Sequence, residues 1–266
     1  MKTNPSSRFA FGAMQFGGTA SAEDARAMYH ACRAAGVAHF DTAYAYTGGA
    51  SERLLGALIR PEREAIFLAT KAGYEGGSSR ANILTTFDES RQRLGCDHVD
   101  LLYLHRWDDT TALEETFETL AELQQQKLIG HIGVSNFAAW QVMKAQSVAQ
   151  SLGTRIDFIQ PMYNLVKRQV EVEILPMCQS EAIIPCTYSP LGGGLLTGKY
   201  SSDTSQGRLV TDTRYAARYG LPEMHAAATR LNALAAALNT HPATLAAAWV
   251  AAHPAHPGRP CQCHRT

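Results

Sequence analysis

The sequence has no excess of charge of either sign, and it has no long hydrophobic run. Lys plus Arg and Asp plus Glu each number 24 among 266 residues. Proteins that bind nucleic acid or an anionic membrane need a basic surface, so we expect a small-molecule ligand held in a local pocket. The apolar segment 244–252 is too short to cross a bilayer, and the N-terminus has no apolar signal-peptide region. We therefore expect a cytoplasmic protein.

A regular cysteine framework is also missing. The six cysteines, at positions 32, 96, 178, 186, 261 and 263, follow no repeated spacing, and a chain of this size does not need disulfides to fold. We expect reduced thiols. Apolar residues make up 45% of the chain and charged residues 18%, which excludes a disordered protein. The length suits one domain of about 250 residues, the typical size of an α/β barrel.

Apolar runs alternate with helical patterns along the chain. The runs lack a period of two, which is typical of parallel strands buried on both faces. They cover residues 37–40, 65–69, 99–104, 129–134, 156–159 and 183–188. Helical periodicity is clearest over 22–35 and 111–128, and Thr111 and Glu114 predict a capping box for the second helix. The strand–helix alternation predicts a parallel sheet, and the absence of G-x-G-x-x-G after the first strand favours a (β/α)8 barrel over an open sheet.

Ionisable side chains end three consecutive predicted strands: Asp41, Lys71 and His105. In a barrel these strand ends carry the chemistry and meet at one rim, although each residue alone could equally be structural. Tyr46, in the loop after Asp41, adds a phenol. Lys71 would lower the pKa of Tyr46 so that the phenol can protonate a carbonyl, and Asp41 would keep Lys71 charged. His105 would donate a hydrogen bond to the substrate oxygen. None of these groups can supply a hydride, so a redox reaction requires a cofactor.

The later predicted strands end in uncharged polar and aromatic residues. Ser135, Asn136 and Gln160 offer hydroxyl and amide groups, and Tyr188 with Ser189 offers a flat ring and a second hydroxyl. This set suits an aromatic cofactor that carries a carboxamide better than it suits a metal ion. Helix capping is the alternative role for Ser135 and Asn136.

The next segment, 189–200, nearly matches a P-loop. Gly193 to Lys199 fits G-x-x-x-x-G-K, but Tyr200 stands where the magnesium-binding hydroxyl belongs, which argues against an NTPase. Exposed glycine amides and Lys199 would still suit a cofactor phosphate, because the loops after strands 7 and 8 form the usual phosphate site of this barrel.

Taken together, these motifs resemble those of the aldo-keto reductase family. The matching segments span about residues 8–252 in the family's order, and they are 40–46 (FDTAYAY), 51–52, 69–71 (ATK), 100–105 (DLLYLH), 132–136 (IGVSN), 159–160, 163–164, 188–191 (YSPL) and 196–200 (LTGKY). The resemblance implies a TIM-barrel fold and NADPH-dependent reduction of an aldehyde or ketone to an alcohol, without a metal ion.

The resemblance also implies a role for each matching residue. Tyr46 would be the general acid, Lys71 and Asp41 would tune it, and His105 would orient the carbonyl. The residues that would bind NADP(H) are Ser135, Asn136 and Gln160 at the nicotinamide carboxamide, Tyr188 stacked on its ring, and Ser189, Leu191, Gly192, Gly193, Lys199 and Arg208 along the pyrophosphate. The substrate pocket would be shaped by Met14, Gln15, Trp107 and the segment 201–220, although Trp107 could equally pack at the rim.

The C-terminal sequence departs from this family. Prolines 254, 257 and 260 exclude a central strand over their segment, so we expect a barrel domain at 1–253 that lacks the eighth strand–helix unit, followed by an irregular tail at 254–266. We interpret the tail as truncated or frameshifted. Its cysteines and histidines, at 253, 256, 261, 263 and 264, could bind a metal but show no recognised ligand spacing.

Two other functions stay open. An incomplete barrel with an open sheet edge between its first and seventh strands could be a non-catalytic nicotinamide-binding protein or scaffold. A metal-dependent hydrolase is disfavoured, because no second histidine or carboxylate joins His105 at a suitable spacing.

Overall fold

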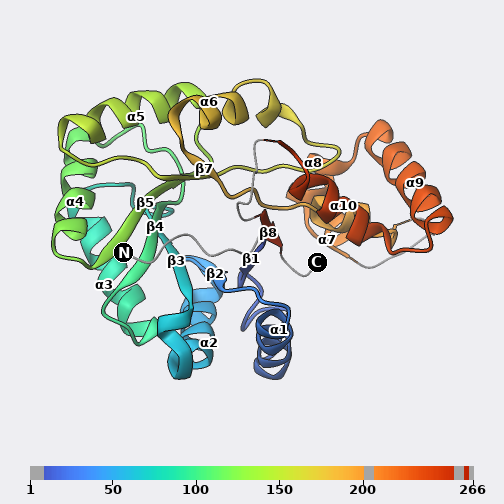
Figure 1. The fold of residues 1–266 in the computed structure, drawn as a ribbon, viewed down its shortest axis with the longest axis horizontal. Coiled ribbons are helices and arrows are strands. Elements are labelled where there is room, and N and C mark those ends of the chain that lie inside the picture. The colour runs from blue at the N-terminus through green and yellow to red at the C-terminus, as the bar shows by residue number, and fades with distance from the viewer. Residues whose placement is uncertain (1–8, 201–206, 255–260, 264–266) are drawn as a thin grey trace.

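A curved parallel sheet forms the centre of the molecule (Figure 1). The computed structural model describes residues 9–200, 207–254 and 261–263. The strands are β1 (Phe9–Gly12), β2 (His39–Asp41), β3 (Phe67–Ala72), β4 (Val99–Leu104), β5 (Ile129–Ser135), β6 (Phe158–Gln160), β7 (Ile184–Pro185) and β8 (Cys261–Cys263). Their order in the sheet is β7-β6-β5-β4-β3-β2-β1-β8. The predicted α/β barrel topology is therefore confirmed, and β4 has the bounds expected from the sequence.

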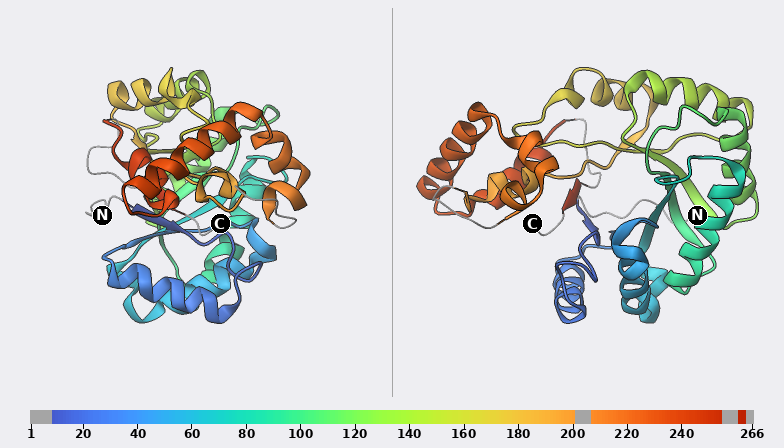
Figure 2. Two further views of the ribbon diagram at one scale, coloured as in Figure 1. Left: turned by 90° about the vertical axis from the view of Figure 1, so that its right-hand side faces the viewer. Right: turned by 180° about the vertical axis from the view of Figure 1, so that it is seen from behind.

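The helices form two groups, and α9 lies farthest from the sheet (Figures 1 and 2). Those on the outer side of the sheet are α1 (Ala22–Ala34), α2 (Ala50–Ile59), α3 (Arg80–Leu94), α4 (Leu113–Gln125), α5 (Ala139–Ser151) and α6 (Ile174–Glu181). The second group is α7 (Arg208–Thr211), α8 (Thr213–Tyr219), α9 (Pro222–Ala237) and α10 (Pro242–Ala251). Between the groups, the 3-10 segment η4 (Gly192–Thr197) packs against α9 and α10.

Both faces of the sheet are buried, which explains the missing period of two. Along β4, Leu102 and Leu104 join the core beneath the outer helices, whereas Leu101 and Tyr103 join a second core inside the curve. Burying both faces of a strand requires apolar residues at consecutive positions. The consecutive apolar residues in the sequence therefore follow from the burial of both sheet faces.

The predicted helix at 111–128 begins later than expected, and its capping box is not formed. The N-cap residue is Ala112, which has no side chain that can accept a hydrogen bond. The Thr111 hydroxyl instead donates to Asp108 at 2.6 Å, and Asp108 also accepts the backbone N–H of Ser78 at 2.7 Å. The hydrogen bond to Asp108 thus replaces the capping bond of Thr111. The same carboxylate links the loop after β4 to the loop after β3.

The sequence predicted an open sheet edge, and the sheet is open. It also predicted an irregular tail, but the tail contains one short strand. Among the described residues β7 pairs only with β6, and no helix follows β8. However, Cys261–Cys263 pairs in parallel with Phe9–Phe11, so part of the tail forms a short strand beside β1, while the eighth strand–helix unit of a closed barrel is missing from the described residues. All three prolines precede this strand in the sequence, so its own backbone keeps its N–H donors. Of the suggested metal ligands, His253 is described and packs edge-on against the Tyr163 ring at 5.8 Å, whereas the side chains at 256, 261, 263 and 264 lie outside the described ones.

The structure describes the side chains of four of the six cysteines. Cys32, Cys96, Cys178 and Cys186 form no disulfide in the described part of the chain.

A buried histidine lies inside the curve of the sheet. His39 of β2 is 0% exposed, neither ring nitrogen has a hydrogen-bond partner among the described residues, and the ring packs edge-on against Phe67 at 4.8 Å. Burial disfavours the imidazolium and lowers the pKa of His39 to about 4, with Lys71 adding to the effect and Asp41 opposing it. His39 is therefore neutral in the folded protein at pH 7.

We expect this histidine to make the fold sensitive to acid. An unfolded histidine, with a pKa of about 6.5, binds a proton on acidification before the folded one does, so stability falls as the pH drops from about 6.5 towards 4. Urea unfolding at pH 7.5 and pH 5 should show that the wild type loses about 2 kcal/mol more than His39→Phe over this range. His30→Gln, which removes an exposed histidine from α1, is the control. Equal losses in wild type and His39→Phe would contradict the prediction.

Candidate active site

The ends of three neighbouring strands bring together the ionisable residues expected from the sequence. Asp41 ends β2, Lys71 lies near the end of β3, and His105 directly follows β4. Asp41 and Lys71 are fully buried and form an ion pair, and Lys71 Nζ also donates to the carbonyl oxygen of Thr42 at 2.7 Å. Parallel strands in register carry these side chains to the same edge of the sheet.

Tyr46 lies above this pair. It begins the 3-10 segment η1 (Tyr46–Gly49), and Lys71 Nζ lies 5.0 Å from the centre of its ring. The His105 ring meets the Tyr46 ring edge-on at 5.6 Å, and Tyr74 packs against His105 at 4.8 Å. The phenol, the imidazole and the ammonium group therefore form one compact cluster.

Burial dominates the proton affinities in this cluster. It raises the pKa of Tyr46 well above its ordinary value, and the charge of Asp41 adds to the effect. The lowered pKa of Tyr46 expected from the sequence is wrong, because burial and the negative charge of Asp41 both raise it. Burial lowers the pKa of Lys71, opposed by Asp41, and with the Lys71 charge it lowers the pKa of His105 to about 3. His105 is thus a neutral imidazole at pH 7.

A hydrogen-bonded chain runs from the other wall of the site to this cluster. The Tyr188 hydroxyl donates to Asn136 Oδ1 at 2.8 Å, and Asn136 Nδ2 donates to Ser135 Oγ at 3.1 Å and to the carbonyl oxygen of His105 at 2.9 Å. The Ser135 hydroxyl donates to the Gln160 carbonyl at 2.9 Å, and Gln160 Nε2 donates to Asp41 Oδ2 at 3.0 Å. Asn136 adopts a φ of 59°, which turns its amide back over the strand end.

These groups open into a pocket of about 680 Å³. Of the residues expected from the sequence, those that line it are Met14, Gln15, Tyr46, His105, Ser135, Asn136, Gln160, Tyr188, Ser189, Leu191, Gly193 and Arg208. Asp41 and Lys71 lie buried beneath it. Gly192, Lys199 and Trp107 are not part of its lining, and residues 201–206 of the expected pocket segment lie outside the described residues.

Two of the residues that do not line the pocket have other contacts. Trp107 packs edge-on against Phe137 at 5.2 Å and against Trp140 at 5.7 Å, as in the rim-packing alternative. Lys199 crosses Gly194, where a Cβ atom would lie 2.6 Å from Lys199 Cε. Gly194 also has a φ of 99°, a backbone conformation that favours glycine.

Sequence reasoning missed several lining residues. They are Tyr74, Arg106, Asp212, Arg214, Tyr215 and Arg218. Tyr74 and Arg106 each lie two residues beyond the end of a strand, β3 and β4, so their place after a barrel strand could have indicated them. The other four belong to the segment 201–220, which was expected at the pocket as a whole. Only the position of α8 shows which of its side chains reach the pocket.

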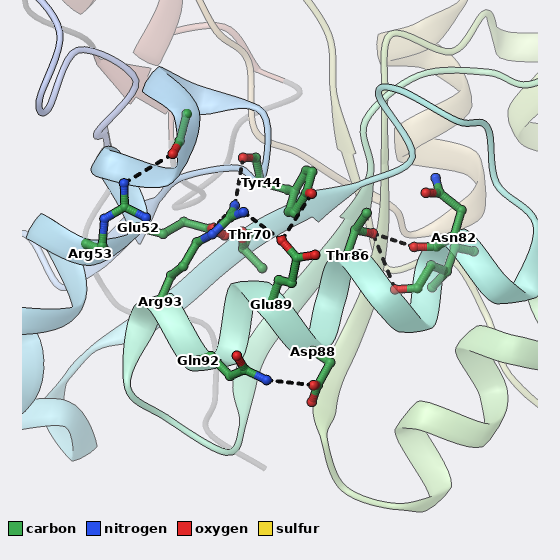
Figure 3. Close-up of polar contacts among 12 residues, drawn as sticks. Tyr44, Glu52, Arg53, Thr70, Asn82, Thr86, Asp88, Glu89, Gln92 and Arg93 are labelled. Carbon is green, nitrogen blue, oxygen red and sulfur yellow. Dashed lines mark hydrogen bonds and ion pairs between the residues drawn. The ribbon is translucent and has the colours of Figure 1, made fainter.

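A buried polar network supports the cluster from behind (Figure 3). Glu52 of α2 is 0% exposed, accepts the Thr70 hydroxyl at 2.7 Å and pairs with Arg93 Nη1 at 3.3 Å. The Arg93 guanidinium stacks on the Tyr44 ring at 4.4 Å and also pairs with Glu89. Thr70 precedes Lys71, and Tyr44 lies in the loop that carries Tyr46, so this network fixes both segments.

The described residues contain no group of three His, Cys, Asp or Glu side chains that could hold a metal ion. Within the same part of the chain, every helix is too short or too polar to span a membrane.

Sequence and structure comparisons agree on one family. The sequence model described as "Aldo/keto reductase family" matches residues 8–258. A probable voltage-gated potassium channel subunit beta of Oryza sativa subsp. japonica is 33% identical over 93% of this chain and 80% of its own length. Aflatoxin B1 aldehyde reductase member 2 of Mus musculus is 36% identical, and L-glyceraldehyde 3-phosphate reductase of Escherichia coli (strain K12) is 32% identical. The matches to these two cover 74% and 72% of this chain but only 55% and 59% of the reductases.

A solved structure supports the same assignment across the whole fold. The glycerol dehydrogenase of Gluconobacter oxydans superposes with a TM-score of 0.83 at 27% identity, and it covers 100% of this chain and 84% of the dehydrogenase. Its agreement with the family match and with the barrel seen here leads to one conclusion: this chain belongs to the aldo/keto reductase family.

Proposed function

We propose that this protein is an NADPH-dependent oxidoreductase that reduces aldehydes or ketones to alcohols, with Tyr46 as the proton donor. The observation that carries the proposal is the cluster at the pocket floor. A phenol and a neutral imidazole face the pocket side by side, and a buried ammonium–carboxylate pair lies directly beneath them. This combination of groups can protonate a carbonyl oxygen and stabilise the charge that the proton leaves behind.

The pocket also suits a nicotinamide dinucleotide. One wall presents Ser135, Asn136 and Gln160, whose hydroxyl and amide groups match a carboxamide, and the flat ring of Tyr188 lies beside them. Gly193 lines the pocket with a φ of 65°, and a Cβ atom there would lie 2.7 Å from the Tyr215 ring, so backbone rather than side chain faces the ligand. Arg208 adds a positive charge for a phosphate. When bound, the cofactor would supply the hydride.

The residues of the cluster then divide the remaining work. Tyr46 keeps its proton in the resting site because its pKa is raised, and it gives that proton to the carbonyl oxygen during reduction. Lys71 stabilises the negative charge that develops on the phenol oxygen, and Asp41 keeps Lys71 charged against the effect of burial. His105, neutral at pH 7, donates a hydrogen bond to the carbonyl oxygen and orients it.

Two measurements test this proposal. NADPH oxidation in the presence of 4-nitrobenzaldehyde should proceed with the purified protein, and titration of NADPH fluorescence should show saturable binding. A metal chelator should change neither result. Binding without turnover would contradict the enzymatic function.

A second function has two observations in its favour. The sheet is not closed between β7 and β8 among the described residues, and one relative carries the name of a channel subunit. A non-catalytic nicotinamide-binding protein or scaffold would bind NADPH in the titration but oxidise none of it. The same two measurements therefore separate the candidates. For either function, a cytoplasmic location stays a prediction.

A further inference from the structure

The pocket wall concentrates positive charge in a chain that has no net charge. Four arginines line the pocket, namely Arg106, Arg208, Arg214 and Arg218, whereas Asp212 is the one acidic residue among the lining residues. His105 is neutral at pH 7 and adds no charge. Nothing in proton donation to a carbonyl requires this excess, so the arginines need another explanation.

The contacts of the four arginines differ. Arg106 stacks on the Tyr74 ring, with Cζ at 4.9 Å from its centre. Arg214 is bound to Asp212, with Nη2 at 2.8 Å from Oδ2. Arg208 and Arg218 stack on the Tyr215 ring, with Cζ at 5.3 and 5.6 Å from its centre. In the described part of the chain, Arg218 forms no ion pair and no hydrogen bond. Its guanidinium is exposed and keeps its donors free.

Arg218 lines the same pocket as Tyr46 and His105. Its charge acts on the hydroxyls of Tyr188 and Tyr219, where it partly offsets the rise in pKa that burial causes. Tyr188 bonds to Asn136, and Asn136 bonds to the backbone of His105. Arg208 belongs to α7 and Arg218 to α8, and both helices pack against the glycine segment η4.

We propose that Arg218 binds an anionic group, a carboxylate or a phosphate ester, on the carbonyl substrate and so selects anionic aldehydes and ketones. The inference rests on the proposed function. A guanidinium that keeps its donors free pairs with both oxyanions through two parallel hydrogen bonds. A cofactor phosphate has the same chemistry, so the experiment has to separate the two sources of negative charge.

The test compares 4-carboxybenzaldehyde with its neutral methyl ester, methyl 4-formylbenzoate. In the wild type, kcat/KM should be higher for the carboxylate, and the preference should shrink as salt is added, because the guanidinium is exposed. Arg218→Gln should lower the ratio of the two kcat/KM values about fivefold, mainly through KM, as is usual for one exposed charge pair. Arg230→Gln makes the same change of charge on the exposed side of α9 and should leave the ratio unchanged.

Titration of NADPH fluorescence separates the cofactor from the substrate. If Arg218→Gln weakens NADPH binding and lowers kcat/KM equally for both aldehydes, the arginine serves a cofactor phosphate and the proposal is overturned. A wild type with no preference for the carboxylate also overturns it. If no aldehyde is reduced at all, the proposed function fails, and calorimetric binding of the two aldehydes decides the inference. Weaker binding of the carboxylate to Arg218→Gln, with the ester as reference, would then support it, and equal binding would refute it.

Discussion

Tyr46→Phe should lower kcat for aldehyde reduction by about 10²- to 10⁴-fold, the usual contribution of a positioned general acid. The change removes the hydroxyl and keeps the ring, which packs against His105 and lies over Lys71. NADPH binding by fluorescence and the free energy of unfolding in urea should both stay close to the wild-type values. A loss of turnover without a loss of binding or stability would therefore identify the proton donor.

Tyr74→Phe is the matched control for this variant. Tyr74 also lines the pocket and also packs against His105, but it is 41% exposed and its ring stacks with Arg106. We expect a much smaller loss of kcat, because no ammonium group stabilises charge on this second phenol. If Tyr46→Phe kept most of its activity, or if both variants lost activity equally, Tyr46 would not be the general acid.

Lys71→Met should destabilise the fold by about 3–5 kcal/mol, as is usual when one partner of a buried ion pair is removed. The Asp41 carboxylate would remain 0% exposed, with Gln160 and the backbone as its remaining neighbours and without its counter-charge. Urea unfolding at pH 7.5 would measure the loss. Because Lys71 also stabilises the developing charge on Tyr46, turnover should fall as well, even in the fraction that remains folded.

The double variant Asp41→Asn/Lys71→Met tests the physical reason. It removes the buried charge together with its partner, and the amide oxygen introduced by Asp41→Asn can still accept the Gln160 hydrogen bond. We expect the double variant to be more stable than Lys71→Met alone, while its turnover stays low. If the two substitutions simply add, the lysine acts through packing and the ion-pair explanation is wrong.

The identity of the cluster residues could be read from the sequence because barrel geometry converts order along the chain into position. Asp41, Lys71 and His105 each follow an apolar run, and parallel strands in register bring such positions to one rim. The same logic correctly placed Asn136, Gln160 and Tyr188 at the pocket. It could not exclude Trp107 or Lys199, because both lie in loops that follow barrel strands. In the structure Trp107 packs against Phe137, and Lys199 lies over the Tyr200 ring.

The pKa of Tyr46 and the hydrogen-bond partner of Thr111 could not be predicted from the sequence, because each depends on several neighbouring groups at once. The pKa of Tyr46 was expected to fall because Lys71 is near, and it rises because burial and Asp41 act on the same group. The capping box at Thr111 failed for a similar reason, since Asp108 competes for the threonine hydroxyl. A local sequence pattern shows which hydrogen-bond and charge partners a residue could have. The tertiary structure determines which of these partners lies within reach.

By itself the sequence determined the family, the strand order and the residues of the cluster, since hydrophobic period and motif order are properties of the chain. Tertiary structure alone decided that Cys261–Cys263 adds to β1 and that α8 brings Arg214 and Arg218 to the pocket. Both depend on contacts between segments far apart in the chain. Such contacts depend on how helices and strands pack against one another, so a local sequence pattern does not predict them.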